Sequence, residues 1–528
     1  MNLKCDFILM FVSARGPKAR RSCSSVTSSC FAVFLCLGLA HGAPGANGLA
    51  VLNPDGFARH IAKFNAMEDE NRTNYISNAQ SWPWLRENIP FFECPDPEVE
   101  EIYFFRWWSL RKHLEKTGNG FVFSEFLTRT NPISSALGHQ INELRWLRDG
   151  HYLDDYILFW LKSAAGRPML HRYSGWVEWA LYQRWRVNQD TEFVVSLLDN
   201  MAGDYRQWED ERLTPGGLFW QFDVRDAMEE SISGSRTNRN LRPTINSYMY
   251  GNARAIAAVA RMAGNTNLAV EFDARAAKLQ RLTQEQLWDA EAMFFKVRLD
   301  TGKFSSAREE IGFIPWYFDL PDPGREAAWA QLPDPGGFLA AFGITTAERR
   351  SPFFRSHGCC HCEWDGAVWP FATSQTLTAL GNVLCDYKQP VITPRDYFNA
   401  FMAYVRSQHA DGKPYIGEYL DETTGQWFNG KEGRSRYYNH STFADLIVTG
   451  VAGLRPGADH TVRLHPLLTP GVWGWFCLDG VNYHGHSLSI IWDADGKRYG
   501  RGKGLCVLAD GHEIARSEKL EPLTGLLP

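Results

Sequence analysis

Four carboxylates lie close together in an aromatic segment of the chain. Asp223, Asp226, Glu229 and Glu230 fall between 219 and 234, beside Phe, Trp and Met residues. Carboxylates crowded into a partly dry site raise one another's pKa, and a raised pKa is what a general acid needs near neutral pH. The alternative is a charged loop that caps the following helix, and composition alone favours neither interpretation.

A further acidic residue, Glu418, lies between an expected strand end and an Asp-Glu-Thr-Thr-Gly turn. An acidic side chain at such a position can point into a cleft. Taken alone, Glu418 is more simply interpreted as an ordinary turn carboxylate.

Two tryptophans flank a glycine in the sequence Trp364-Asp-Gly-Ala-Val-Trp-Pro370, at the expected start of a helix. Sugar rings stack their C–H faces on aromatic rings, while their hydroxyls bind carboxylates and arginines. Core packing explains either tryptophan singly. The combination with Gly366 is more specific and predicts a sugar-sized pocket.

The elements that must position these residues are mainly helical. Apolar residues at helical spacing predict one clear hairpin, in which a helix from 244 to 263 stops at Gly264 and Thr266 caps the next helix. Further helices are predicted at 139–163, 174–189, 192–209, 367–386 and 393–410. The region from 71 to 454 has room for about eleven to thirteen helices with their loops.

The sequence changes character after residue 454. Strands are predicted at 461–465, 481–484, 488–492 and 504–508, and Ala509-Asp-Gly511 forms a tight turn. Residues 455–528 are therefore expected to form a small β-domain with a structural role.

Composition excludes several classes of protein. The 528 residues are 44% hydrophobic and 22% charged, which is ordinary globular usage and not that of a collagen, a coiled coil or a disordered chain. The formal charge of -5 gives no basic field for nucleic acid or an anionic membrane. Aromatic residues make up 14% of the chain, and their amphipathic rings suit a wet binding surface as well as a core.

The N-terminus has the features of an export signal. Basic residues between 15 and 21 precede an apolar run at 30–40, which has the length of a signal h-region. Cleavage before Ala43 would leave a secreted chain with a linker at 43–70, and no later stretch is long and apolar enough to span a membrane. The alternative is a disordered, misassigned leader. Two sequons, at Asn71 and Asn439, would be glycan acceptors in a eukaryotic secretory pathway.

Three of these stretches, taken together, resemble the mannosylglycerate hydrolase-like glycosidases, which are related to processing α-glucosidase I and trehalase. The resemblance rests on Met-Glu-Glu-Ser at 228–231, Trp-x-Gly-x-x-Trp-Pro at 364–370 and Glu-Tyr-x-x-x-Thr-x-Gly at 418–425. It implies an (α/α)6 toroid of helical hairpins over residues 71–454 and hydrolysis with inversion, exo-acting rather than endo-acting. It requires no cofactor.

The same resemblance implies roles for individual residues. Glu229 takes the position of the general acid and Glu418 that of the general base, and an inverting pair stands about 6.5 to 9.5 Å apart. The relatives carry Asp at the acid position, so Asp226, one helical turn away, remains a rival acid. The substrate, an oligosaccharide or glycoside, would meet Trp220, Gln221, Asp223, Arg225, Trp364, Asp365, Gly366, Trp369, Tyr419, Tyr437 and His440. Asp365 departs from the Arg that relatives often carry.

Three other functions remain open. A carbohydrate-binding protein could retain the aromatic cleft without catalysis. A polysaccharide lyase would need positive charge to neutralise a uronate, which the acidic segment at 223–230 opposes. A zinc site, as in the β-L-arabinofuranosidases, could use Cys359, Cys360, Cys362 and Glu363. Ligands so close in sequence rarely all reach one ion, so a disulfide or buried thiols are preferred there.

Overall fold

The computed structural model of the chain describes residues 50–70, 74–358, 362–428 and 433–528. The predicted leader (1–42), the sequon at Asn71 and the cysteines Cys359 and Cys360 lie outside these ranges. The predicted linker, 43–70, is folded in part, because residues 58–65 form a helix that contacts the helix of residues 97–111.

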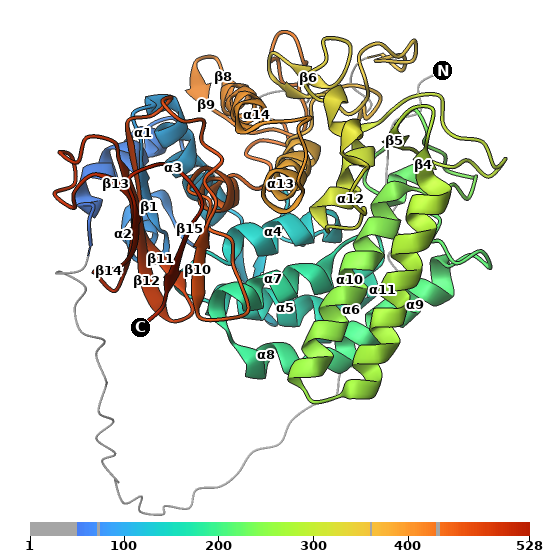
Figure 1. Ribbon diagram of the computed structural model, residues 1–528, viewed down its shortest axis with the longest axis horizontal. Coiled ribbons are helices and arrows are strands. Elements are labelled where there is room, and N and C mark those ends of the chain that lie inside the picture. The colour runs from blue at the N-terminus through green and yellow to red at the C-terminus, as the bar shows by residue number, and fades with distance from the viewer. Residues whose placement is uncertain (1–49, 71–73, 359–361, 429–432) are drawn as a thin grey trace, which may run out of the picture. The chain divides into compact units, whose positions relative to one another are not determined.

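The described chain is mainly helical, as predicted (Figure 1). Its α-helices are α1 (Ala58–Asn65), α2 (Ser81–Asn88), α3 (Pro97–Arg111), α4 (Leu137–Leu144), α5 (His151–Lys162), α6 (Arg167–Leu170), α7 (Val177–Asn188), α8 (Thr191–Val195), α9 (Leu198–Arg212), α10 (Pro243–Met262), α11 (Thr266–Leu287), α12 (Ile314–Tyr317), α13 (Pro370–Asp386), α14 (Pro394–Ser407) and α15 (Ala444–Leu446).

The hairpin of α10 and α11 has the predicted form, and the two green helices run side by side in Figure 1. Gly264 ends the first helix with a φ of 71°, a left-handed conformation that glycine adopts without strain. The cap of the second helix differs from the prediction by one residue. The side chain of Asn265, rather than Thr266, accepts the hydrogen bond from the amide of Leu268.

The single helix predicted at 139–163 is two helices, α4 and α5. The chain leaves the helical path after α4, where Arg145 Nη2 and Trp146 Nε1 each lie 2.7 Å from Asp445 Oδ1. Contacts with a partner 300 residues away in the chain therefore hold the residues that separate the two helices. The helix predicted at 192–209 is likewise divided into α8 and α9.

An antiparallel sheet of five strands stands beside the helices, with the strand order β1-β11-β12-β13-β14 (Figure 1). Its strands are β1 (Phe91–Glu93), β11 (Trp475–Tyr483), β12 (His486–Asp493), β13 (Gly504–Ala509) and β14 (His512–Ser517), and β10 (Thr461–Leu464) pairs separately with β15 (Leu523–Leu526). The predicted turn joins β13 to β14. Asp510 and Gly511 have φ values of 49° and 79°, as a two-residue hairpin turn requires.

The sheet also includes a strand that was not predicted. Strand β1 precedes the long helices in sequence, yet Phe92 pairs with Leu478 of β11. The predicted domain boundary at 454 stays a prediction, because this sheet draws strands from both sides of it.

Short two-stranded hairpins connect the helices. They are β2 (Leu114–Thr117) with β3 (Gly120–Phe123), β4 (Trp288–Asp289) with β5 (Phe294–Phe295), β6 (Leu339–Ala340) with β7 (Gly343–Ile344), and β8 (His409–Ala410) with β9 (Lys413–Pro414). Glu125, which becomes important below, lies two residues after β3.

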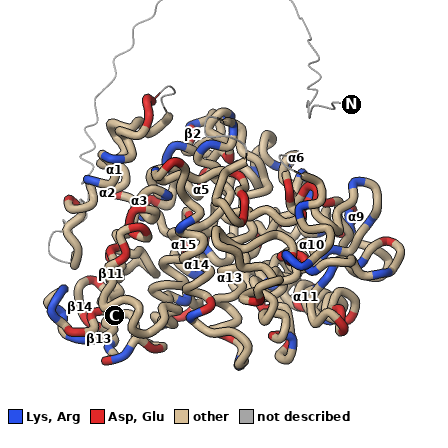
Figure 2. Tube along the Cα trace, turned by 90° about the horizontal axis from the view of Figure 1, so that it is seen from above, with Lys and Arg blue, Asp and Glu red and all other residues tan. Residues whose placement is uncertain are grey.

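Aromatic side chains fill much of the core. The tryptophans that are fully buried are Trp107, Trp108, Trp146, Trp160, Trp176, Trp316 and Trp329. Lys and Arg are interspersed with Asp and Glu along the chain rather than gathered by sign (Figure 2). Of the helices in the described ranges, none has the length and apolar character to cross a bilayer.

Candidate active site

Two segments that carry predicted site residues are joined at Val368 and Leu420. Each amide donates to the carbonyl oxygen of the other residue, with N···O distances of 3.0 Å. This bridge sets the rings of Trp369 and Tyr419 parallel, with centroids 4.6 Å apart. Trp364 stacks on Trp369 at the same centroid separation. The predicted aromatic pocket residues thus form a stack of three rings.

The three-ring stack (Trp364, Trp369 and Tyr419) is almost fully buried. Gly366 lies within the turn that forms it, with a φ of 153°, and a Cβ there would lie 2.6 Å from the ring of Phe354. The stack therefore acts as a rigid support for the polar residues around it.

Glu418 directly precedes Tyr419 and is buried. Its Oε2 accepts a hydrogen bond of 2.7 Å from Ser435 Oγ, and its Oε1 lies 3.6 Å from Arg434 Nη2. The Nε2 of His440 is 3.1 Å from the Glu418 carbonyl oxygen and donates to it. Burial holds the pKa of His440 well below its ordinary value, so the ring is neutral.

Glu229 lies in the loop between the 3-10 turn Asp223–Arg225 and α10, and it is half-buried. Its carbonyl oxygen is 3.4 Å from the amide of Trp364, which ties the loop to the three-ring stack. Burial raises the pKa of Glu229 to about 7, and the charges of Glu418 and Asp223 contribute to the rise. Glu229 and Glu418 are therefore close enough for their charges to interact.

Asp226, the rival acid, is engaged elsewhere. Its Oδ2 lies 2.7 Å from Arg242 Nε and accepts a short hydrogen bond from Thr244 Oγ1, and the side chains of Asp226 and Arg242 are fully buried. This carboxylate is enclosed in the protein interior.

The residues at 220–225 occupy three different environments. Trp220 lies beside the guanidinium groups of Arg212 and Arg239, whose Cζ atoms are 4.6 and 4.7 Å from the ring centroid. Gln221 and Asp223 are buried.

The polar contacts of this segment are local. Gln221 Nε2 donates to Ser174 Oγ at 3.0 Å, and Asp223 Oδ1 accepts from the amide of Val224 at 2.7 Å. Arg225 is exposed and donates to the Arg172 carbonyl oxygen.

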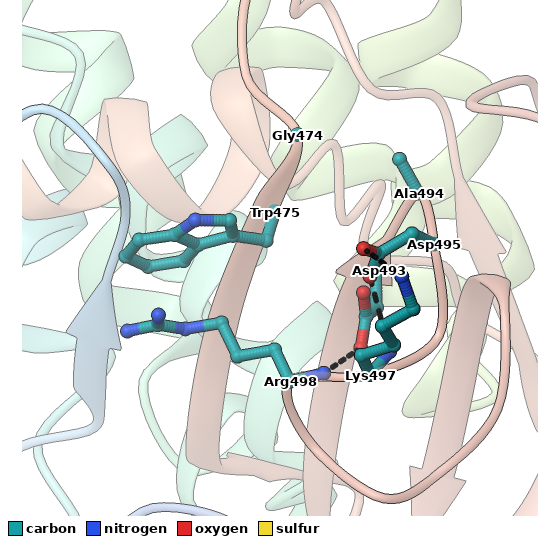
Figure 3. Close-up of a pocket in the computed structure, with 7 residues that line it drawn as sticks. All are labelled: Gly474, Trp475, Asp493, Ala494, Asp495, Lys497 and Arg498. Carbon is teal, nitrogen blue, oxygen red and sulfur yellow. Dashed lines mark hydrogen bonds and ion pairs between the residues drawn. The ribbon is translucent and has the colours of Figure 1, made fainter.

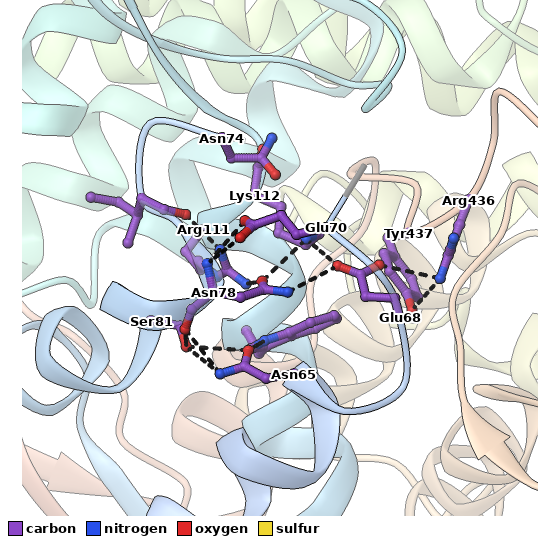
Figure 4. Close-up of polar contacts among 12 residues, drawn as sticks. Asn65, Glu68, Glu70, Asn74, Asn78, Ser81, Arg111, Lys112, Arg436 and Tyr437 are labelled. Atoms are coloured by element: carbon purple, nitrogen blue, oxygen red, sulfur yellow. Dashed lines mark hydrogen bonds and ion pairs between the residues drawn. The ribbon is translucent and has the colours of Figure 1, made fainter. Parts of the chain in front are cut away.

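Asp365 and Tyr437 are both held by neighbours. The buried carboxylate of Asp365 lies 2.9 Å from His357 Nδ1 and accepts a hydrogen bond from the His357 amide. The ring of Tyr437 packs edge-on against Phe105 and Trp108 of α3. Figure 4 shows Tyr437 beside Arg436, which forms an ion pair with Glu68.

Glu125 is an acidic residue of this site that the sequence did not single out. Its Oε1 accepts hydrogen bonds from Ser135 Oγ at 2.9 Å and from Tyr438 Oη at 2.8 Å. Burial raises the pKa of Glu125 to about 7, and the charge of Glu418 adds to the effect. No motif surrounds it, because Phe-Ser-Glu-Phe resembles any half-buried strand end.

The structure describes two of the four residues of the zinc alternative, Cys362 and Glu363. The described ranges contain no group of three or more His, Cys, Asp or Glu side chains arranged to hold an ion. Burial, followed by the charges of Glu418 and Glu229, raises the pKa of the Cys362 thiol. Cys359 and Cys360, the other cysteines of the predicted alternative, lie outside the described residues.

A surface cavity of about 440 Å³ lies on the C-terminal sheet (Figure 3). Its lining residues are Gly474, Trp475, Asp493, Ala494, Asp495, Lys497 and Arg498. The Arg498 guanidinium lies over the Trp475 ring, with Cζ 3.3 Å from the centroid. No predicted site residue lines this cavity. We place the candidate active site at Glu229 and Glu418, which the three-ring stack brings together.

The mainly helical fold, with neighbouring carboxylates beside stacked aromatic rings, places the chain in the class of (α/α)6 glycosidases. Residues 129–441 match the mannosylglycerate hydrolase MGH1-like glycoside hydrolase domain, and the chain belongs to this family.

Solved structures agree with the fold. The GH63 mannosylglycerate hydrolase from Thermus thermophilus, in complex with glucose, matches with a TM-score of 0.50 and 15% identity over 66% of this chain and 99% of that chain. The GH78 family rhamnosidase of Bacillus sp. GL1 matches with a TM-score of 0.55 and 16% identity over 80% of this chain and 41% of that chain.

A more similar structure is described as a sialidase. It is 45% identical, with a TM-score of 0.90, over 92% of this chain and 46% of that chain. The chain thus spans less than half the length of the sialidase that it matches.

Proposed function

We propose that this glycoside hydrolase cleaves its substrate with inversion at the anomeric carbon, using Glu229 as general acid and Glu418 as general base. The observation that carries the proposal is that both carboxylates are tied to the three-ring stack: Glu418 directly precedes Tyr419, and the carbonyl oxygen of Glu229 is 3.4 Å from the amide of Trp364. Burial and the charge of Glu418 raise the pKa of Glu229 to about 7, which supports the same assignment. A carboxyl group with this pKa keeps its proton near neutral pH and can donate it.

In the proposed reaction, Glu229 donates its proton to the glycosidic oxygen as the bond from that oxygen to the anomeric carbon breaks. Glu418 takes a proton from a water molecule, whose oxygen forms a new bond to the anomeric carbon on the opposite face. The products are an alcohol and a sugar of inverted configuration. Glu418 then holds a proton and Glu229 has lost one, and exchange with solvent restores both groups.

The surroundings of the two carboxylates suit these roles. Glu418 faces Arg434 and Ser435, which fix the orientation of its carboxylate. Glu229 has a half-buried position, whereas its rival Asp226 is fully buried against Arg242. A general acid must reach the substrate, so we assign the acid to Glu229.

We further propose a neutral glycoside as substrate and export of the chain by its leader. A sialoside is the alternative, suggested by the description of the sialidase relative. The charge of Glu418 acts on both Glu125 and Glu229, and an anionic sugar would be repelled by such a group of carboxylates. An exo-acting enzyme remains our expectation.

The experiment that tests the reaction is a screen of aryl glycosides, including α-mannosides, α-glucosides, α-L-rhamnosides and an α-sialoside. For each active substrate, proton NMR during the first minutes identifies the anomer that is released. We expect the inverted anomer; the retained anomer would refute the assignment of Glu418 as base. Binding without hydrolysis of any glycoside would favour a carbohydrate-binding protein instead.

A further inference from the structure

Glu125 is a buried carboxylate to which the proposed reaction gives no role. It is 3% exposed, and both of its hydrogen bonds, from Ser135 and Tyr438, go to the same oxygen, Oε1. Oε2 accepts no hydrogen bond from the described residues. A glutamine could accept the same two hydroxyl donors without the cost of burying a charge, so support of the fold alone does not explain a glutamate here.

Two chains of contacts connect Glu125 to Glu418. In the first, the ring of Tyr438 packs edge-on against His440, with centroids 4.1 Å apart, and His440 donates to the carbonyl oxygen of Glu418. The Tyr438 hydroxyl is the group that binds Glu125.

The second chain passes through Phe126, the residue after Glu125. The guanidinium of Arg434 lies over the Phe126 ring, with Cζ 5.0 Å from the centroid, and it reaches to 3.6 Å from Glu418 Oε1. The charge of Glu125 also acts on Arg434. Glu125 therefore belongs to the same site as the proposed base.

The charge of Glu125 also reaches the acid side of the site. Burial and then the charges of Glu229 and Glu125 raise the pKa of the Tyr173 hydroxyl to about 12. A group whose charge is felt beside Glu418 and near Glu229 is well placed to meet the sugar that these two residues act on.

We propose that Glu125 is a sugar-binding residue. Its Oε2 accepts a hydrogen bond from one hydroxyl of the sugar whose glycosidic bond Glu229 and Glu418 cleave. The proposal rests on the proposed function. Ser135 and Tyr438 hold Oε1 and thereby turn Oε2 toward the substrate. The hydroxyl that Oε2 binds decides which sugars are accepted, because a sugar without it leaves a buried carboxylate unpaired.

The test combines Glu125→Gln with single-deoxy analogues of the best aryl glycoside from the screen. The wild type should lose about 10- to 100-fold in kcat/KM on the one analogue that lacks the bound hydroxyl. On the parent glycoside, the kcat/KM of Glu125→Gln should be lower than that of the wild type by a similar factor. On that analogue, the variant and the wild type should have nearly the same kcat/KM. Glu422→Gln, the same change at a carboxylate that pairs with Arg355 instead, is the matched control and should keep the wild-type preference for the parent.

Two results would overturn the proposal. One is a Glu125→Gln enzyme with the kcat/KM of the wild type on the parent glycoside. The other is a variant that loses activity but discriminates among the deoxy analogues as the wild type does, since that pattern indicates a structural role. Thermal unfolding of each variant establishes that it is folded.

A binding experiment separates this proposal from the proposed function. The methyl glycosides of mannose, glucose and rhamnose are titrated into Glu418→Gln and into the double variant with Glu125→Gln, with tryptophan fluorescence as the readout. We expect about 10- to 100-fold weaker binding in the double variant. Equal affinities would overturn the role of Glu125, whereas a wild type that binds these sugars but hydrolyses none would contradict the proposed function alone.

Discussion

Asp226 and Arg242 form an ion pair of 2.7 Å in which neither side chain is exposed to solvent. Two charges in such a place stabilise the protein only as a pair, since each alone carries a large desolvation cost. This pair holds Asp226, the rival acid, in the protein interior, beside the loop that carries Glu229.

The first prediction concerns the stability that this pair provides. Asp226→Asn should lower the free energy of unfolding by about 3 to 5 kcal/mol, because it leaves the Arg242 charge buried without a partner. Urea unfolding followed by circular dichroism measures this change. Glu209→Gln breaks a half-buried pair with Arg275 and should cost no more than about 1 kcal/mol. A variant Asp226→Asn that keeps its stability and loses its activity would make Asp226 the acid.

The second prediction is the pH dependence of catalysis. The pKa of Glu229 is raised to about 7, and a general acid works only while protonated, so kcat/KM should fall as the pH rises above about 7. Glu229→Gln should lose about 100- to 10,000-fold on substrates with poor leaving groups. It should lose far less on a dinitrophenyl glycoside, which departs without protonation. An equal loss on both kinds of substrate would show that Glu229 is not the acid.

The third prediction tests the base. Glu418→Gln should lower kcat by about 100- to 10,000-fold, because the proposed reaction assigns removal of the proton from water to this carboxylate. Azide, which attacks without losing a proton, should restore turnover and give a glycosyl azide of inverted configuration. Glu422→Gln, four residues away and paired with Arg355, is the control and should keep its activity. Full activity in Glu418→Gln would exclude it as base.

The fourth prediction concerns how the raised pKa of Glu125 makes the free energy of unfolding depend on pH. Folding raises this pKa from 4.5 to about 7, so the folded state binds more protons than the unfolded state between those values. The contribution of Glu125 to the free energy of unfolding is fully present below about pH 4.5 and is lost as the pH rises through about 7. The total loss is about 3 kcal/mol. Glu125→Gln should therefore gain stability relative to the wild type between about pH 5 and pH 8. A difference that does not change with pH in urea unfolding would contradict this.

The fifth prediction concerns the turn beneath the three-ring stack. Gly366→Ala should lower stability by about 1 to 3 kcal/mol, because the new methyl group overlaps the ring of Phe354 and the φ of 153° is unfavourable for alanine. Gly203→Ala is the matched control. Gly203 lies within helix α9 with open space at its Cβ, so this change should stabilise the protein slightly. Differential scanning calorimetry compares the two, and a harmless Gly366→Ala would mean that the turn can adapt.

Local signals in the sequence were sufficient to predict several elements. The hairpin of α10 and α11 follows from apolar spacing and Gly264, and the β13–β14 turn follows from Asp510 and Gly511. These features depend on neighbours within a few residues, and they can therefore be predicted from the sequence alone. The (α/α)6 architecture came from the motif resemblance and is confirmed by the solved structures.

Features that depend on distant partners could not be predicted. At the break between α4 and α5, Trp146 contacts Asp445, and Tyr437 packs against Phe105 and Trp108. Glu125 has no motif, and its burial arises only when Ser135 and Tyr438 meet around it. The roles of Glu229 and Glu418 stay predictions, although the structure brings their charges together.

The sheet that joins β1 to β11 has a consequence for how the chain folds. The amide of Leu52 donates to Asp479 Oδ2 at 2.8 Å, and 427 residues separate the two. During synthesis, the segment around Leu52 can make this contact only after β11 has been synthesised. Closing so long a loop carries an entropic cost, and this cost is smaller once the intervening helices have folded. We therefore expect the segment around Leu52 and strand β1 to pack against β11 last, after the helices have folded.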